Sequence, residues 1–343
     1  MFKKKMFRRS FLITGAGAIA ALAQEKADDK KPDIVAGATQ DPTPRVGIVL
    51  SSFKEGEEHD GTKLPGLRDP QPPSADLTSA QLDAMVRKAI ELGGMKASEF
   101  YETIEPEGWI VILTRPQADS RIVATTLAYL AEHKRGLRFT VVGRLAKAGE
   151  WGEDYRKLVS GLGAKFPKVR FELMDLNSAA TADVAVADKP GVTYSVPKVV
   201  QQCDSIISIA PLSTDPVRGV SLSIANYAAL SSKPAATDEA LIDLFSCHPA
   251  DLALVGGCVG VEGDGTPIHY NVVIAGMKAV AVDSVAAAVM GFKPADLPFL
   301  ALGQKRGFGS WDPDDIWTRG NEIEEAKRDF KKPTGWRRRD SAL

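Results

Sequence analysis

Two polar stretches of the sequence contain residue types that bind ions or transfer protons. The first, residues 210–227 (APLSTDPVRGVSLSIANY), directly follows a β-rich run. Open α/β sheets bind ligands at the carboxyl ends of their strands, so a polar segment at this place is a candidate site. Its candidate ligand-binding residues are Thr214, Asp215, Arg218 and Asn226. A polar loop that caps the next helix would use the same hydroxyls and carboxylate, and this alternative stays open.

The second stretch, residues 255–267 (VGGCVGVEGDGTP), contains five glycines and two acids. Glycine permits positive φ angles and close approach of the backbone to a ligand. The carboxylates could bind a cation or act as a base, whereas the alternative is a tight glycine turn with solvated acids. The candidates are Glu262, Gly263 and Gly265, together with Asp283 in a later run of small residues.

The sequence lacks the common catalytic signatures. No glycine-rich phosphate motif opens an expected helix, and no G-x-S-x-G, H-E-x-x-H or Walker pattern occurs. These absences disfavour common hydrolases, zinc proteases and nucleotide-dependent dehydrogenases. The spacing of Cys203, Cys247 and Cys258 matches no zinc or iron–sulfur pattern, so we expect no metal, no iron–sulfur cluster and no other cofactor. We expect the cysteines to be buried, while a Cys247–Cys258 bridge stays open in an oxidising compartment.

The elements that would position these residues alternate between strand and helix. Short connections between β-rich runs and helices indicate parallel strands joined by right-handed crossovers. We therefore expect an α/β fold with a mostly parallel sheet flanked by helices, built as two α/β halves, residues 45–190 and 191–330, with a cleft between them. Strands are predicted at 45–51, 109–113, 137–142, 169–173, 205–209, 252–255 and 272–275, and helices at 120–135, 153–163, 196–202, 238–245 and 280–290.

A further helix, which begins after Thr78, has the most complete set of signals. Thr78 and Gln81 have the spacing of a capping box, and Leu77 and Leu82 have that of a hydrophobic staple. Apolar residues then recur at helical spacing. Gly93 is expected to end the helix in the left-handed conformation.

The N-terminus has the organisation of an export signal. A basic segment precedes an apolar run, and residues 21–23 (ALA) fit a small-x-small cleavage site. Residues 8–12 (RRSFL) resemble the core of a twin-arginine signal, with a general secretory signal as the alternative. The apolar run is shorter than the ~20 residues of a membrane-spanning helix. We expect a signal peptide over residues 1–23, cleaved near Ala23, with the twin-arginine export machinery as a partner, a periplasmic or otherwise exported location, and no permanent membrane span.

Composition and charge narrow the class of protein further. Hydrophobic residues make up 44% and charged residues 25%, as in folded soluble proteins. Removal of the five basic residues in the signal lowers the net charge from −1 to −6, which disfavours nucleic acid as a partner. Residues 24–44 are predicted to be a flexible tether, and residues 331–343 a polar tail.

Several motifs, taken in order, resemble the family known as domain of unknown function 362. They are WIVILTRP, APLSTDPVRGVSLSIAN, LVGGCVGVEGDGTP, AVAVDSVAAAVMG and GFGSWDPDDIWTRG, and the resemblance spans roughly residues 45–320. Several members of that family carry ferredoxin-like iron–sulfur modules, and this chain lacks the cysteine clusters for one. The positions that match the family pattern are Asn226, Glu262, Gly263, Gly265 and Asp283.

Other positions depart from the family pattern. Thr114 and Gln117 replace the common lysine and asparagine, and residues 213–215 (STD) replace lysine-threonine-histidine. Ala225 stands in place of a lysine, and Gly256 in place of an aspartate. These changes remove cations and a histidine that would hold an anionic ligand or donate protons.

Two functions are compatible with this pattern. In the first, the chain is an exported enzyme or ligand-binding protein whose small polar or anionic ligand lies in the cleft between the halves, where Arg115 joins the candidates above. In the alternative, it is a non-catalytic periplasmic accessory or partner-binding protein with a degenerate family site. A converging polar pocket would favour the first, and an exposed apolar patch the second. Whether the chain is an enzyme stays open.

Overall fold

The computed structural model describes residues 43–57, 61–95, 107–132, 136–145, 151–232 and 235–336. Thr43–Leu343 forms one compact unit. The expected signal peptide and the expected tether up to residue 42 lie outside the described residues. Within the described part, no helix is both long and apolar enough to cross a membrane.

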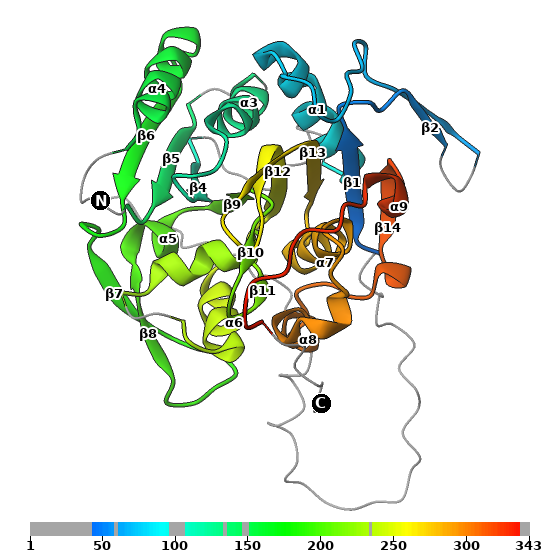
Figure 1. The fold of residues 1–343 in the computed structure, drawn as a ribbon. Helices are drawn as coiled ribbons and strands as arrows, with labels where there is room; N and C mark the ends of the chain where they lie inside the picture. Colours follow the sequence, from blue (N-terminus) through cyan, green and yellow to red (C-terminus); the bar gives the residue numbers. More distant parts are fainter. Residues whose placement is uncertain are drawn as a thin grey trace, which may run out of the picture. The chain divides into compact units, whose positions relative to one another are not determined.

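Eight strands form the central sheet, in the order β14-β1-β13-β12-β9-β4-β5-β6 (Figure 1). The strands from β12 to β6 in this order are parallel to one another, and β1 is parallel to β14. Only β13 in this sheet runs antiparallel to both of its neighbours. The predicted α/β class with a mostly parallel sheet is therefore confirmed. In sheet order the strands are β14 (Trp317–Gly320), β1 (Arg45–Leu50), β13 (Pro267–Gly276), β12 (Leu252–Val261), β9 (Ser205–Ala210), β4 (Trp109–Thr114), β5 (Arg138–Gly143) and β6 (Arg170–Asp175).

The strands of the two expected halves interleave in this sheet. β9 comes after residue 190 in sequence but pairs with β4 of the first half, whereas β1 pairs with β13 and β14 of the second half. A boundary at residue 190 therefore does not divide the sheet, and the expected cleft between two separate α/β halves has no counterpart in its topology. The hydrogen-bonded register of β4 with β9 joins the two parts instead.

The order of strands reverses at β4. From β4 the chain proceeds outward through β5 to β6, and it then returns to the other side of β4 as β9. The connections that leave the carboxyl ends of β4 and β9 therefore diverge to opposite sides. In open parallel sheets, this topological switch point is the usual place for a ligand.

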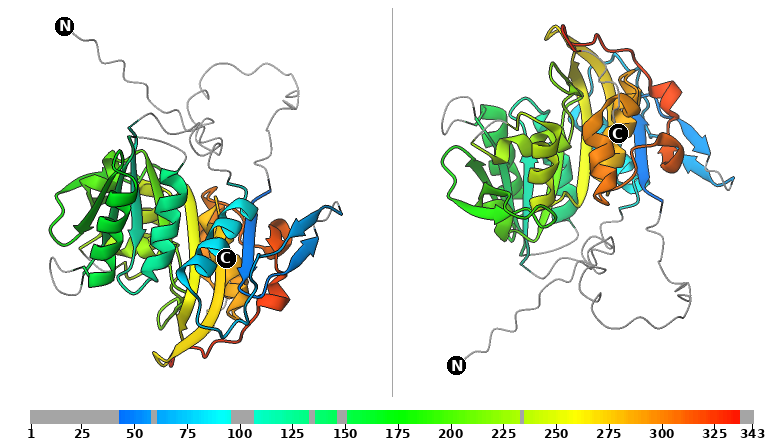
Figure 2. Two further views of the ribbon diagram at one scale, coloured as in Figure 1. Left: turned by 90° about the horizontal axis from the view of Figure 1, so that it is seen from above. Right: turned by 90° about the horizontal axis from the view of Figure 1, so that it is seen from below.

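Helices cover both faces of the sheet (Figure 2). The side chains of each helical layer form an apolar core with alternate residues of the strands, because successive strand residues point to opposite faces. One layer contains α1 (Ser79–Leu92), α3 (Ser120–Ala131) and α4 (Glu153–Lys165); the other contains α5 (Lys198–Gln202), α6 (Asp238–Cys247), α7 (Ala279–Val289) and α8 (Pro298–Lys305). After α7 the chain also forms two short 3₁₀ turns, η2 (Pro294–Asp296) and η3 (Pro313–Asp315), and the one-turn helix α9 (Ile323–Ala326).

The ends of α1 show how closely the sequence specifies this layer. The capping box is confirmed: the Gln81 amide donates to Thr78 Oγ1 at 3.3 Å, and the Thr78 amide donates to Gln81 Oε1 at 2.9 Å. The prediction that Gly93 adopts the left-handed conformation is wrong by one position. Gly93 keeps a φ of −68°, and Gly94 has the positive φ of 89°, so the backbone reverses one residue later.

Two small hairpins add to the fold without a clear signal in the sequence. One pairs β2 (Glu55–Glu57) with β3 (Lys63–Pro65), and the other pairs β7 (Thr181–Ala185) with β8 (Thr193–Pro197). Their strands have three or five residues and contain Ala, Asp, Gly and Glu, which are depleted in strands. Their pairing therefore depends on the rest of the fold.

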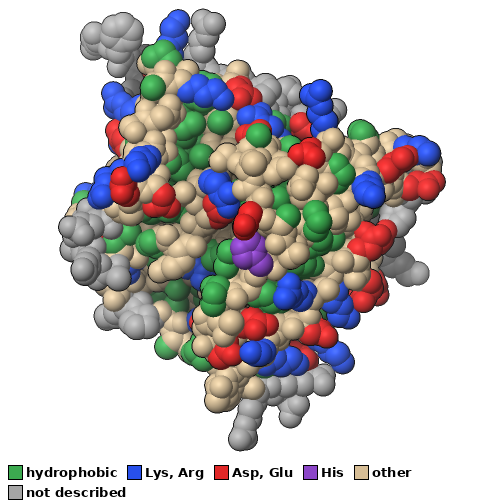
Figure 3. Space-filling view, turned by 45° about the horizontal axis from the view of Figure 1, so that its top comes forward, with side chains coloured by type: hydrophobic (Ala, Val, Ile, Leu, Met, Phe, Trp, Pro, Cys, Tyr) green, Lys and Arg blue, Asp and Glu red, His purple; other side chains and the backbone are tan. Residues whose placement is uncertain are grey.

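Basic and acidic side chains are interspersed over the face of the molecule that Figure 3 shows. Arg87 of α1, for example, donates to Asp83 at 2.8 Å and to Glu132 at 2.7 Å. These hydrogen bonds, that to Glu132 foremost, raise the pKa of Arg87 above its usual value. Because Glu132 directly follows α3, this ion pair ties α1 to the C-terminal end of α3 within one layer.

Candidate functional site

Arg115 lies directly after β4, at the switch point. Its Nη1 donates to Ser221 Oγ and its Nη2 donates to the Ser221 carbonyl, both at 2.7 Å. The side chain as a whole is half-buried, but its Nε atom is fully buried and has no hydrogen-bond partner in the described part of the chain. Burial lowers the pKa of Arg115 to about 10, and the negative charges of Asp283 and Asp215 limit this shift.

Asp283 of α7 faces the same segment and is fully buried. Its Oδ1 accepts hydrogen bonds from the amide and the hydroxyl of Ser223, at 2.9 and 2.5 Å, and its Oδ2 accepts from the Ile224 amide at 2.9 Å. The carboxylate thus holds the first residues of the 3₁₀ helix η1 (Ile224–Leu230). Burial raises the pKa of Asp283 to about 6, although these hydrogen bonds and Arg115 act in the opposite direction.

Asn226 of η1 joins the carboxyl ends of β4 and β9. Its Nδ2 donates to the carbonyl oxygens of Leu113 at 3.2 Å and Ile209 at 2.9 Å, and to Ser208 Oγ at 3.0 Å. Ser208 in turn donates to the Ser223 carbonyl at 2.8 Å. The Oδ1 of Asn226 is buried and has no partner among the described residues. The amide therefore closes the gap between two diverging strands and keeps one unused acceptor.

These contacts define a largely buried polar cluster at the switch point. We call it the carboxyl-edge cluster; its members are Arg115, Ser208, Ser221, Ser223, Asn226 and Asp283. Three of the predicted site residues, Arg115, Asn226 and Asp283, are thus brought together from three distant parts of the sequence. The segment that carries the serines supplies most of their hydrogen bonds, so the chain itself fills much of the switch-point crevice.

Three other predicted residues lie in a neighbouring hairpin, formed by β10 (Thr214–Asp215) and β11 (Gly219–Val220). Asp215 accepts the amides of Val217 and Arg218 at 2.9 and 2.7 Å and so closes the turn rather than capping a helix. Arg218 forms an ion pair with Asp238 at 3.2 Å and donates to the Thr237 carbonyl. Thr214 donates to the Val261 carbonyl at 3.4 Å. Arg218 is therefore already engaged with the beginning of α6.

The predicted glycine turn is largely a strand. β12 continues to Val261, and the turn to β13 occupies only residues 262–266. A Cβ on Gly256 would lie 2.1 Å from the Val272 carbonyl oxygen, and its φ is 137°, so this glycine permits close approach of β12 to β13. The register shifts between Gly257 and Val259. Glycine within a strand pattern is typical of such a bulge, and this interpretation fits the structure better than a ligand-binding turn.

Glu262, Gly263 and Gly265 lie at the tip of this hairpin, where the C-terminal segment crosses it. The Gly263 amide donates to the Lys331 carbonyl at 2.9 Å, and Glu262 Oε1 accepts the Lys331 amide at 3.2 Å. Lys331 Nζ lies 3.1 Å from Asp264. No hydrogen bond or ion pair of the described residues links Glu262 to Arg115, Asn226 or Asp283. The expected polar tail therefore begins with a docked segment, and the hairpin tip is separate from the carboxyl-edge cluster.

The serines of the cluster were not among the predicted residues. Ser208 is the one polar residue inside the apolar strand 205–209 apart from its first position, and this placement is the signal that could have identified it. Ser221 and Ser223 alternate in the sequence GVSLS, so their side chains share one side of an extended segment. Polar residues on the inner side of an otherwise apolar segment indicate an internal hydrogen-bond partner.

The three cysteines are free, and no Cys247–Cys258 bridge is present. Cys203 and Cys258 are buried, as predicted, and Cys247 is half-buried. Burial raises the pKa of Cys203 to about 12 and that of Cys247 to about 11, which leaves both as protonated thiols near neutral pH. Within the described ranges, no group of three His, Cys, Asp or Glu residues is arranged to hold a metal ion.

The fold and the cluster define an α/β protein with a mostly parallel sheet and a polar cluster at its switch point. The family described as "Domain of unknown function (DUF362)" matches residues 113–288, slightly more than half of the chain. The protein therefore belongs to the DUF362 family. The matched region includes Arg115 only two residues from its beginning, and it ends after Asp283.

Two solved structures show distant similarity. The lactate racemase apoprotein from Thermoanaerobacterium thermosaccharolyticum is 13% identical, with a TM-score of 0.35 over 68% of this chain and 61% of that one. The CMeT domain of the citrinin polyketide synthase is 11% identical, with a TM-score of 0.23 over 52% of this chain and 34% of that one. The chain thus spans less than two thirds of the length of either structure. No curated protein matches the sequence.

Proposed function

We propose that this DUF362 protein is exported and binds a small anion at the carboxyl-edge cluster. The observation that carries the proposal is Arg115, a half-buried cation that forms no ion pair with a described residue and keeps its buried Nε unpaired. An unpaired buried donor costs about 1–3 kcal/mol, which a carboxylate or phosphate oxygen would recover. Export rests on the signal pattern in residues 1–23, and the ligand-binding role rests on this arginine.

Each member of the cluster has a defined part in this proposal. Arg115 supplies the positive charge, and Ser221 fixes the plane of its guanidinium. Asn226 offers its unpaired Oδ1 to a hydroxyl or N–H group of the ligand. Asp283 holds Ser223 and thereby the start of η1. Because residues 221–226 fill the crevice, admission of a ligand requires this segment to shift.

Calorimetric titration of the mature protein with acetate, malonate and phosphate tests the proposal. Loss of a charge-assisted hydrogen bond of about 1.5–3 kcal/mol weakens binding by roughly tenfold to a hundredfold, and Arg115→Leu should show this loss. Arg115→Lys should retain part of the affinity, because it keeps the charge without the planar fork. Arg156→Leu, at an exposed position in α4, is the matched control. Equal affinity in the wild type and Arg115→Leu would contradict the proposal.

The alternative is a non-catalytic accessory or partner-binding protein with a degenerate family site. It is favoured by the fact that the chain's own groups already occupy Asp283, which accepts three hydrogen bonds, and Arg218, which is paired with Asp238. Under this alternative, protein purified after native export carries no small molecule and copurifies with a stable partner protein. A retained small anion and no copurifying protein favours the first function.

A further inference from the structure

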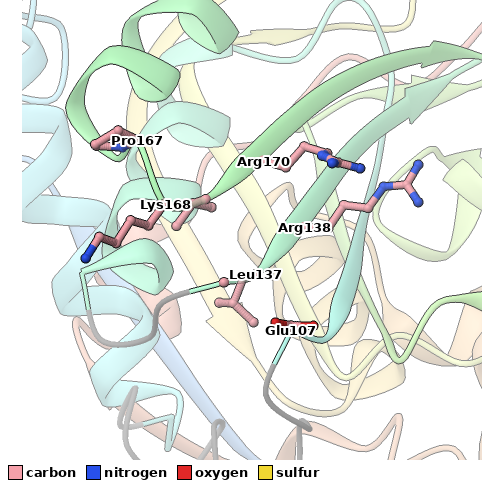
Figure 4. Close-up of a pocket in the computed structure, with 8 residues that line it drawn as sticks. Glu107, Leu137, Arg138, Pro167, Lys168 and Arg170 are labelled. Atoms are coloured by element: carbon pink, nitrogen blue, oxygen red, sulfur yellow. The ribbon is translucent and has the colours of Figure 1, made fainter.

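A second charged region lies at the opposite ends of the strands. A hollow of about 600 Å³ opens at the amino ends of β5 and β6 (Figure 4). Arg138 and Arg170 are the first residues of these two strands, whereas Arg115 follows the last residue of β4. The hollow is therefore distinct from the carboxyl-edge cluster. Its lining residues are Glu107, Gly136, Leu137, Arg138, Pro167, Lys168, Val169 and Arg170.

Two arginines lie side by side at this hollow. Arg138 and Arg170 are direct register partners on adjacent parallel strands, a placement in which like charges destabilise each other. Glu172 compensates them unequally: it accepts from Arg138 Nη2 at 2.8 Å, whereas Arg170 Nε lies 4.0 Å away. The guanidinium of Arg138 is also stacked over Trp109, 4.0 Å from the ring centroid. Arg138 is therefore fixed, and the exposed Arg170 is free to contact a ligand.

Lys168 adds a third cation on the other side of the hollow. Its side chain points away from the two arginines in Figure 4, and its ammonium has no partner among the described residues. Glu107 lies at the base, also without a partner in the described part of the chain. Three cations and the two carboxylates of Glu107 and Glu172 therefore lie at or beside the hollow. Cations outnumber carboxylates there, although we expect the mature chain to carry a net negative charge.

We propose that this hollow binds an anionic sugar of monosaccharide size. Its phosphate, sulfate or carboxylate group would be held by Arg170, and its hydroxyls would accept from Lys168 on the other side of the hollow and donate to the unpaired carboxylate of Glu107. The volume suits such a ligand, since small-molecule sites are typically ~300–1,000 Å³. The polar lining favours a ligand with several hydroxyls over an apolar one. This site is independent of the anion proposed at Arg115.

Saturation-transfer NMR and calorimetry with glucose 6-phosphate, glucose 6-sulfate, glucuronate and neutral glucose test the proposal. The first three distinguish the source of the oxyanion, and glucose reports binding through hydroxyls alone. We expect Lys168→Gln/Arg170→Gln to weaken binding of the best anionic sugar by at least about tenfold. The matched control, Lys63→Gln/Lys157→Gln, removes the same charge from exposed ion pairs elsewhere and should change the affinity less than about twofold.

Glu107→Gln separates sugar recognition from simple charge attraction. Removal of a negative charge should strengthen binding of inorganic phosphate, while loss of a hydroxyl acceptor should weaken binding of the anionic sugar relative to phosphate. Three results would overturn the proposal: no binding of any anionic sugar at millimolar concentration, equal losses in the two double variants, or parallel changes for sugar and phosphate in Glu107→Gln.

Discussion

Asn226→Leu removes the side chain that joins β4 to β9 at the switch point. Leucine branches at the same side-chain atom and has the same number of heavy atoms, so the variant removes the hydrogen bonds without truncating the side chain. Asn226 Nδ2 makes three hydrogen bonds, to the carbonyls of Leu113 and Ile209 and to Ser208 Oγ, and all of these groups are buried. Its Oδ1 makes none among the described residues. On substitution, stability is therefore lost with the hydrogen bonds of Nδ2 and gained with the removal of the unpaired Oδ1.

The magnitude follows from these atoms. The amide has two hydrogens for these three acceptors, and two buried hydrogen bonds at about 1.5 kcal/mol each contribute about 3 kcal/mol to stability. Removal of the unpaired Oδ1 returns about 1 kcal/mol, since a buried acceptor without a partner is unfavourable. Ile209 keeps a hydrogen bond from Thr114 Oγ1 at 3.0 Å, which limits any further cost. We expect Asn226→Leu to decrease the free energy of unfolding by about 2 kcal/mol.

Urea denaturation of the protein, followed by far-ultraviolet circular dichroism, measures this difference. Ser160→Ala, on the exposed side of α4, is the control and should change the free energy of unfolding by less than about 0.5 kcal/mol. A decrease below about 0.5 kcal/mol in Asn226→Leu would refute the reasoning, because the two strand ends would then not depend on this amide.

Three further changes test other parts of the structure. Burial raises the pKa of Asp283 from 3.8 to about 6, so the folded state binds this proton more tightly; the resulting stability is full below about pH 4 and is lost as the pH rises through about 6. This pH-dependent contribution to the free energy of unfolding is up to about 3 kcal/mol. Urea titrations from pH 4 to 7 should show the decrease in the wild type and not in Asp283→Asn. The same pH dependence in both proteins argues against ionisation of this carboxyl. Gly256→Ala should decrease the free energy of unfolding by more than about 3 kcal/mol, because its Cβ meets a backbone carbonyl. Gly161→Ala, which has open space, is the control, and equal melting temperatures for both variants would exclude the strand interpretation. Trp336→Ala removes the indole packed on β11, and amide exchange at residues 262–265 should accelerate; unchanged exchange would show that the C-terminal segment does not hold the hairpin tip.

The fold could be predicted from the sequence where local signals and burial agree. The apolar run at 109–113 indicates a strand covered on both faces, and it forms β4 at the centre of the parallel region. The capping box at Thr78 specifies the start of α1 through contacts within four residues. Such elements depend on their own sequence, so a single chain is enough to predict them.

The site could be predicted only in part, because its contacts are long-range. Arg115, Asn226 and Asp283 meet through hydrogen bonds between groups 60 or more residues apart, such as the Ser223 amide and Asp283. Glu262 satisfies the same sequence criteria, yet it bonds to Lys331 across the hairpin tip. The order of strands decides which polar residues share an edge, and the sequence pattern does not contain that order. For the same reason, two separate halves were expected where one sheet forms.

Native mass spectrometry of the protein, wild type against Arg115→Leu, reports directly whether the carboxyl-edge cluster holds an anion. We expect that a small anion remains bound to the wild type, is released on addition of excess malonate, and is absent from Arg115→Leu while the variant keeps the wild-type circular dichroism spectrum. The same retained mass in both proteins, or none in the wild type together with no malonate adduct, would contradict it.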